Sequence, residues 1–175
     1  TFDDQRITAM FTRENKLWLG FFQGGLKVLD IVGGDLHSPR ITSGDNTAIT
    51  KILAGFDSED TWIATYSHGL FRITDSGTKS YYEDGSLPEK SITVLFRSKS
   101  NILLAVSENR VYQHDPETDH FKEILFEFGL GEKRPIIYAF NQGHDDDILI
   151  GTKEHGLFIW SRKKQIEKQF KLQPA

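Results

Sequence analysis

The sequence contains no cysteine among its 175 residues. This absence excludes disulfide bonds, thiol catalysis and thiolate metal ligands. Segments with the apolar spacing of an amphipathic helix are almost absent as well, which disfavours a helical fold. No apolar run approaches the length of a membrane span, and no segment has the pattern of a secretory signal peptide. The chain begins with Thr rather than Met, so we expect it to be a piece of a longer protein.

The sequence also lacks a concentration of charge of one sign. It has 21 Lys and Arg against 25 Asp and Glu, for a net charge of −4, and the basic residues are scattered. This distribution disfavours a nucleic-acid-binding protein, which would carry a basic footprint. No phosphate-binding loop, dinucleotide-binding fingerprint, zinc-protease motif or nucleophile elbow is present. Composition and motifs therefore give no support to the common classes of enzyme.

What the sequence does contain is one pattern repeated four times. Each copy has an apolar segment, a polar loop, a second apolar segment ending in a small residue, and then Gly-Leu or a substitute. The second segments carry anchor residues that lie 44, 41 and 46 residues apart, namely Trp18, Trp62, Leu103 and Leu149. Seven positions after these anchors stand Gly25, Gly69, Arg110 and Gly156. A constant internal spacing within a period of roughly 40–45 residues is typical of a β-propeller blade.

Each repeat resolves into four apolar segments, so the sequence predicts an all-β propeller segment of four four-stranded antiparallel blades. The predicted blades cover residues 6–47, 48–90, 91–134 and 135–173. First strands, nearly continuous in apolar residues, are predicted at 7–11, 49–53, 92–96 and 136–140. Third strands are predicted at 26–29, 70–73, 111–114 and 157–160. Fourth strands are less regular, with candidates near Ile41 and at 79–82, 121–126 and 166–172.

Local residue types support two details of this blade. The small residue that ends each second strand indicates close approach of a neighbouring sheet. A Gly stands before three of the four third strands, where it suits a turn position with positive φ. In the third copy Asn109 precedes Arg110, and Asn109 is expected to take the left-handed conformation instead.

The second copy has the clearest motif, Thr61-Trp62-Ile63-Ala64-Thr65 followed by Gly69-Leu70-Phe71-Arg72-Ile73. Together with the link Glu83-Asp84-Gly85-Ser86-Leu87-Pro88 before Ser91-Ile92-Thr93, it resembles the two-component regulator propeller repeat. The resemblance covers essentially the whole chain, although the third copy lacks both the Trp and the Gly. It implies the periplasmic sensor region of a membrane-anchored hybrid histidine kinase/response regulator of Bacteroides type, whose signals are often oligosaccharides.

The loops between second and third strands are the candidate ligand site, because they gather on one face of a propeller. They carry an aromatic side chain and flexible hydrogen-bonding groups that suit a sugar, at Gln23, Tyr66, His68, Asn109, Lys153, Glu154 and His155. His68 and His155 occupy equivalent positions two repeats apart, so two imidazoles across a channel could bind a metal or serve as acid and base. Each also precedes a turn Gly, where His needs no function.

We therefore predict a non-catalytic module for ligand sensing or assembly, with an oligosaccharide ligand and with no cofactor, metal, nucleic acid or membrane contact. Two alternatives remain open at this stage. One is a propeller enzyme of the streptogramin lyase type, in which His68 or His155 would work with a metal. The other is a scaffold whose loops bind protein.

Four complete blades leave two blade faces uncovered unless they curl into a tight ring. These faces are expected to be lined by Ile7, Phe11, Leu157 and Ile159, and apolar burial contributes roughly 25 cal/mol per Å². We expect self-association through these faces, in which two open arcs form an eight-bladed assembly with two-fold symmetry.

Overall fold

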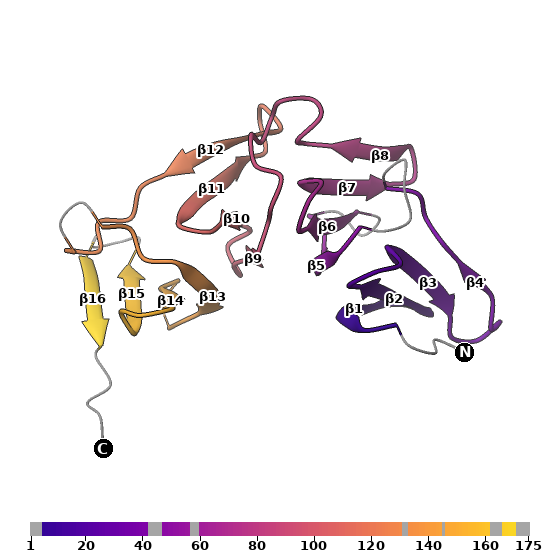
Figure 1. Cartoon of the computed structure of the whole chain (residues 1–175), viewed down its shortest axis with the longest axis horizontal. Helices are drawn as coiled ribbons and strands as arrows, with labels where there is room; N and C mark the ends of the chain where they lie inside the picture. Colours follow the sequence, from indigo (N-terminus) through magenta and orange to yellow (C-terminus); the bar gives the residue numbers. More distant parts are fainter. Residues whose placement is uncertain are drawn as a thin grey trace, which may run out of the picture. The chain divides into compact units, whose positions relative to one another are not determined.

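The computed structural model describes residues 5–41, 47–56, 60–130, 133–144, 146–161 and 166–170. These described residues form sixteen strands and no helix, and the strands form four four-stranded sheets (Figure 1). In each sheet the strands are hydrogen-bonded in sequence order. The predicted all-β class and the four antiparallel blades are confirmed.

The four blades have the same composition of strands. Blade 1 consists of β1 (Ile7–Arg13), β2 (Lys16–Phe21), β3 (Leu26–Asp30) and β4 (Leu36–His37). Blade 2 consists of β5 (Ile49–Ala54), β6 (Thr61–Thr65), β7 (Leu70–Thr74) and β8 (Gly77–Ser80). Blade 3 consists of β9 (Val94–Arg97), β10 (Leu103–Ser107), β11 (Arg110–Asp115) and β12 (His120–Ile124). Blade 4 consists of β13 (Ile137–Gln142), β14 (Ile148–Thr152), β15 (Leu157–Ser161) and β16 (Ile166–Phe170).

The fourth strand of blade 1 lies earlier than the sequence predicted. It is β4 at Leu36–His37 rather than a strand near Ile41, because the chain reverses directly after β3. The Asp30 carboxylate accepts hydrogen bonds from the backbone N–H groups of Val32 (2.9 Å) and Gly33 (2.8 Å), which closes a tight turn. The same two bonds lower the pKa of Asp30 below its usual value, and the bond from Gly33 has the larger effect.

Blade 3 departs from the predicted repeat in the turn between its second and third strands. Ser107 pairs directly with Arg110, which leaves a two-residue turn, and Glu108 rather than Asn109 has the positive φ of 53°. Leu104 therefore lies opposite Gln113, three residues after Arg110, just as Trp18 lies opposite Val28, three residues after Gly25. The prediction that Leu103 occupies the Trp position is therefore wrong by one residue.

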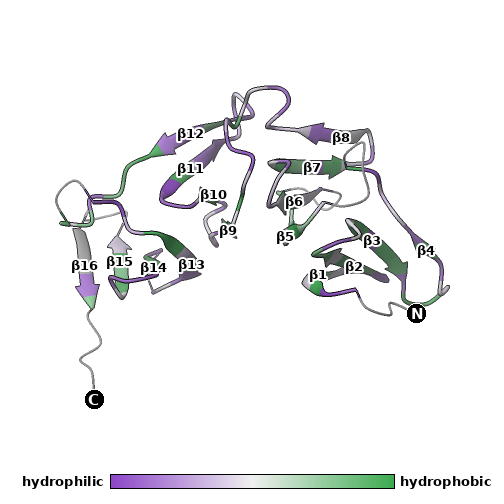
Figure 2. Cartoon of the chain, viewed as in Figure 1, coloured by the Kyte–Doolittle hydropathy of each residue, from purple (hydrophilic) through white to green (hydrophobic). Residues whose placement is uncertain are grey.

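The chain divides into two compact units, residues 1–95 and 96–175. In the first unit the core lies between blades 1 and 2. Blade 1 contributes its Trp and three smaller apolar side chains, and blade 2 contributes three Ile and a Phe. These residues are Ala9, Trp18, Leu26 and Val28 against Ile49, Ile52, Ile63 and Phe71, all buried. Figure 2 shows that hydrophobic residues run along the strands, as in β3 and β13, while hydrophilic residues gather in the turns.

A β-bulge in β1 decides which side chains face this core. The register shifts between Ile7 and Ala9, so Ile7 and Phe11 point to opposite sides of the sheet instead of the same side. Phe11 packs against the core between blades 1 and 2, whereas Ile7 is 42% exposed. The prediction that Phe11 lines an uncovered blade face is therefore wrong.

In the second unit, aromatic rings fill the space between blade 4 and the segment that follows β12. The Phe128 ring meets the Phe158 ring edge-on with centroids 4.8 Å apart. The Phe126 ring meets the Trp160 ring edge-on with centroids 5.4 Å apart, and its centroid lies 6.3 Å from that of Phe140. Such pairs add about 0.5–1.5 kcal/mol each beyond their buried area. The abundance of Phe in the sequence thus serves packing.

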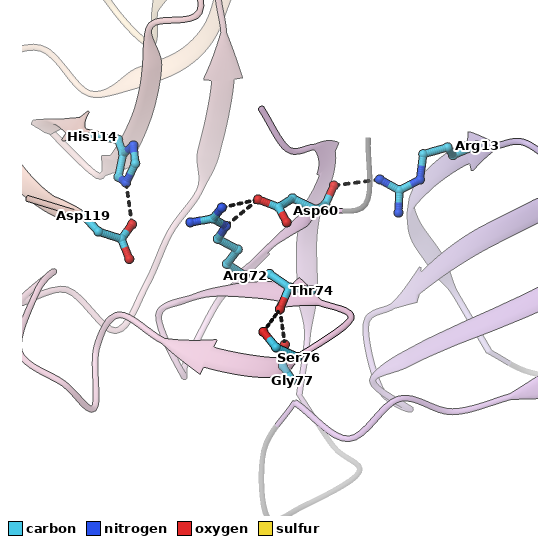
Figure 3. A network of polar contacts seen from close by, with 8 residues as sticks. All are labelled: Arg13, Asp60, Arg72, Thr74, Ser76, Gly77, His114 and Asp119. Carbon is cyan, nitrogen blue, oxygen red and sulfur yellow. Dashed lines mark hydrogen bonds and ion pairs between the residues drawn. The ribbon is translucent and has the colours of Figure 1, made fainter. Parts of the chain in front are cut away.

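Polar contacts also join blades 1 and 2. Arg13 at the end of β1 donates to the carbonyl oxygen of Asp60 (2.8 Å; Figure 3). It also donates to the hydroxyl of Thr61 (3.1 Å). The buried Asp60 carboxylate in turn accepts two hydrogen bonds from the Arg72 guanidinium, that from Nε being 2.6 Å long. The Arg72 guanidinium lies 5.6 Å from the centre of the Trp62 ring. Asp60 therefore acts twice: its carboxylate fixes Arg72 over the Trp62 ring, and its backbone carbonyl binds Arg13 of blade 1.

Close approach of blades 1 and 2 is visible at Gly20. A Cβ placed there would lie 2.5 Å from the Cγ2 atom of Ile49, nearer than side chains pack. Beside it the Thr8 hydroxyl donates a 2.5 Å hydrogen bond to the Ile49 carbonyl, and Thr50 makes the same bond to Ile92. The small residue and the Thr together set the distance between successive first strands.

We expect Gly20→Ala to lower the free energy of unfolding by about 1–3 kcal/mol, because the added methyl overpacks the core. Gly33→Ala is the matched control, since a Cβ at the exposed Gly33 has no neighbour nearer than the Asp30 Cγ at 3.5 Å. Urea unfolding of both variants tests this. Equal stability of the two variants would contradict the proposed close contact.

Candidate functional site

All seven candidate residues lie in the turns that join second to third strands. Gln23 lies between β2 and β3, Tyr66 and His68 between β6 and β7, and Asn109 between β10 and β11. Lys153, Glu154 and His155 lie between β14 and β15. Six of the seven side chains are exposed and His155 is half-buried. The turns thus present these groups to solvent, as a binding role requires.

The turns of blades 2 and 4 share a structure that follows from a Thr-x-x-His-Gly sequence. The Thr65 hydroxyl accepts the N–H of His68 (3.0 Å) and donates to the carbonyl of Gly69 (2.8 Å). The Thr152 hydroxyl makes the same two bonds, to His155 (3.2 Å) and Gly156 (2.8 Å). Both Gly residues have a φ of 79°, which only Gly adopts without strain. One hydroxyl therefore holds each turn and places the His at its tip.

The two imidazoles have different surroundings. The Nδ1 atom of His68 lies 2.9 Å from the Ser67 hydroxyl and 3.4 Å from that of Thr47. The Nδ1 atom of His155 is buried and has no hydrogen-bond partner among the described residues. His68 belongs to the first compact unit and His155 to the second, so the two imidazoles are described separately.

The turn of blade 4 borders two cavities. The larger, of about 580 Å³, is lined by Leu130, Thr152, Lys153, Glu154, His155, Gly156 and Gln169. The smaller, of about 260 Å³, adds the link before β13 and is lined by Lys133, Arg134, Pro135, Ile136, Lys153, Glu154 and His155. The structure thus brings three of the predicted site residues together in one concave region.

Cations exceed anions around these cavities. Their linings include three cationic side chains, Lys133, Arg134 and Lys153, and one carboxylate, that of Glu154. Arg134 donates one bond to Glu123 (2.7 Å), which uses one of the five N–H groups of its guanidinium. Carboxylate or sulfate groups of a ligand are the natural partners of such a set.

Sequence reasoning missed the second wall of this region. The link 133–136 carries no turn motif, and Gln169 lies on a strand that approaches the turn from a distance in sequence. Gln169 donates through its side-chain amide to the His155 carbonyl (2.9 Å). Conversely, Gln23, Tyr66, His68 and Asn109 do not line these two cavities. The basic residues before a predicted first strand were the available signal.

Another His, in blade 3, makes a carboxylate contact that suggests catalysis at first sight. The Nε2 atom of His114 lies 2.9 Å from Asp119 (Figure 3). The centre of the His114 ring lies 5.1 Å from that of Phe121. The His114 side chain is 2% exposed, so a substrate cannot reach it. Within the described residues, no three His, Asp or Glu side chains lie close enough together to hold a metal.

Comparison with known proteins places the fold. No family model matches the sequence, and no curated protein matches it. Among solved structures, the chain is similar to the extracellular domain of the hybrid two-component system protein BT4673 from B. thetaiotaomicron. The identity is 19% and the TM-score 0.74, over 94% of this chain and 22% of that one. The extracellular domain of BT3049 from the same organism gives 13% and 0.71, over 97% of this chain and 22% of that one.

The chain shares the propeller-blade fold of these extracellular domains. This agrees with its resemblance to the two-component regulator propeller repeat. The chain spans less than a quarter of the length of either protein chain. The computationally designed protein Ika4 also matches, at 19% identity and a TM-score of 0.62, over 90% of this chain and 91% of that one. As for membrane contact, the described residues include no helix that is both long and apolar enough to cross a bilayer.

We expect Thr65→Val to lower the free energy of unfolding by about 1–2 kcal/mol, because the His68 amide loses its acceptor while the shape is kept. Amide hydrogen exchange at His68 should quicken in the same variant. Thr78→Val, at an exposed position of the same blade, should change stability by less than about 0.5 kcal/mol. Equal effects of the two substitutions would show that the hydroxyl does not hold the turn.

Proposed function

We propose that the chain is a non-catalytic ligand-binding module of a periplasmic sensor and that it binds an oligosaccharide bearing acidic groups. The observation that carries this proposal is the pair of cavities beside the β14–β15 turn, with its surplus of cationic side chains. The ligand would lie between this turn and the link 133–136.

The lining of the cavities suits a sugar in several respects. The larger volume, about 580 Å³, is within the range of small-molecule sites. Lys153 and Gln169 supply donors and Glu154 an acceptor, so hydroxyl groups of either hydrogen-bonding role can be satisfied. Leu130 and Ile136 supply apolar surface for the C–H faces of sugar rings. The cations select ligands that carry carboxylate or sulfate.

Two further points favour sensing over catalysis. The fold is shared with extracellular domains of two-component system proteins. The Nδ1 atom of His155 has no hydrogen-bond partner among the described residues, so no carboxylate orients this imidazole through Nδ1 as a catalytic base requires. A sensor works by binding its ligand with unequal affinity in two states of the receptor, and this requires no reaction.

Calorimetric titration of the 175-residue protein with neutral and acidic oligosaccharides of equal length tests the proposal. The acidic series should bind more tightly, and added salt should weaken binding, because ions screen exposed charges. Lys153→Gln should reduce affinity at least about tenfold, since hydrogen bonds to charged groups contribute roughly 1.5–3 kcal/mol.

The matched control is Lys99→Gln, an exposed Lys in the turn between β9 and β10, at the opposite end of the strands. It should leave affinity unchanged. Binding that is indifferent to both Lys153 and salt would overturn the assignment of the acidic ligand. No binding by either series at millimolar concentration would overturn the sugar-binding function as a whole.

A further inference from the structure

Blade 4 carries a surface equivalent to the one that blade 1 buries. Strand registers match Gly151 with Gly20, because each pairs with the first residue of the third strand and with an Ala of the first strand. The same registers give blade 4 an acceptor face, consisting of Ala139, Leu149, Leu157 and Ile159. These four residues are the counterparts of Ala9, Trp18, Leu26 and Val28.

The acceptor face of blade 4 is uncovered. Leu157 is 38% exposed where its counterpart Leu26 is 2% exposed. Ala139 is exposed, and Leu149 and Ile159 are half-buried. Side chains on the other side of the same strands, Ile148, Ile150 and Phe158, are buried. The sheet is therefore apolar on both sides but packed on one.

Blade 1 carries the complementary surface, which is also uncovered in part. Its insertion face consists of Ile7, Met10, Leu19 and Lys27, which correspond by register to Ile49, Ile52, Ile63 and Phe71 of blade 2. Ile7 and Met10 are 42% and 67% exposed, whereas Ile49 and Ile52 are 1% and 2% exposed. Leu19 is already buried.

We propose that the acceptor face of blade 4 binds the insertion face of blade 1 of a second copy of this chain. The interface between blades 1 and 2 is the template for this contact. Every copy carries both faces, so the acceptor face of one copy can receive blade 1 of another. The contact is head-to-tail, because different surfaces of the two copies meet.

Gly151 supports this docking mode independently of exposure. At Gly20 the missing Cβ leaves room for the Ile49 side chain, which a Cβ would meet at 2.5 Å. At Gly151 the equivalent room is empty, with no atom nearer than 3.6 Å. Ile7 of the second copy, the counterpart of Ile49, fits this space.

The insertion face differs from its template at one position. Lys27 stands where blade 2 has Phe71. Its ammonium group donates to the side-chain oxygen of Gln5 (3.0 Å) and lies 5.1 Å from the centre of the Phe21 ring. The methylene stem of such a tethered Lys can cover apolar surface while the charge stays bonded at the side.

Light scattering after size exclusion, at roughly 10–100 µM protein, tests the proposal. The 20.0 kDa chain should run as a dimer or larger species. Met10→Lys and Leu157→Lys should each yield a monomer although the other face is unaltered, because a charge then enters every contact between an acceptor face and an insertion face. Val32→Lys changes another exposed apolar residue, 78% exposed in the turn after β3, and should leave the mass unchanged.

Mixing the two monomeric variants distinguishes a head-to-tail contact from a symmetric one. The Met10→Lys copy retains a good acceptor face and the Leu157→Lys copy a good insertion face, so a one-to-one pair should form. The Met10→Lys/Leu157→Lys double variant should stay monomeric alone and in both mixtures. Circular dichroism establishes that each variant is folded. A wild-type protein that is folded but monomeric at about 100 µM would overturn the proposal. Association that survives Leu157→Lys would also overturn it.

Discussion

Among the described residues the core of blades 1 and 2 lies between the two sheets and not within either, and the rest of the structure depends on that constraint. A four-stranded sheet one layer thick becomes stable when its apolar faces are covered by neighbouring sheets. In blade 2 the residues that face blade 1, such as Ile63 and Phe71, are buried because Trp18 and Val28 lie opposite them. In blade 4 the alternation of Ile148, Leu149 and Ile150 shows the same two-sided design with one side still accessible. Stability is therefore a property of pairs of blades rather than of single sheets.

The same constraint explains where binding groups can lie. Strand residues are committed to packing, so chemistry is left to turns and links, which vary without disturbing the sheets. Thr152 fixes the turn at one end of blade 4 by bonding both the His155 amide and the Gly156 carbonyl. The link before β13 contributes cations next to this turn. A rigid scaffold thus holds two variable segments, and the chemistry of the site can change while the fold stays.

The sequence was sufficient for the fold because a blade leaves a local record in residue type and spacing. Trp18, Trp62 and Leu149 occupy equivalent positions, whereas Leu103 does not. The reason is the two-residue turn between Ser107 and Arg110, whose length no residue type in the repeat indicates. Phe11 was placed on the wrong side since a bulge at Ile7 reverses the alternation of β1. The candidate site was predictable as a set of turns. Which turn forms a cavity was not predictable, because its walls come from segments far apart in sequence, such as Lys133 and Gln169.

The contact of Gly20 with Ile49 has a consequence for how relatives of this chain can diverge. The space between the second strand of one blade and the first strand of the next is shared by one residue from each, so the two side chains have a nearly fixed total volume. A larger residue at the position of Gly20 would then require a smaller one at that of Ile49, 29 positions later in the chain. Among homologous propellers these two positions should covary in size, and the correlation should recur once per blade with the period of the repeat.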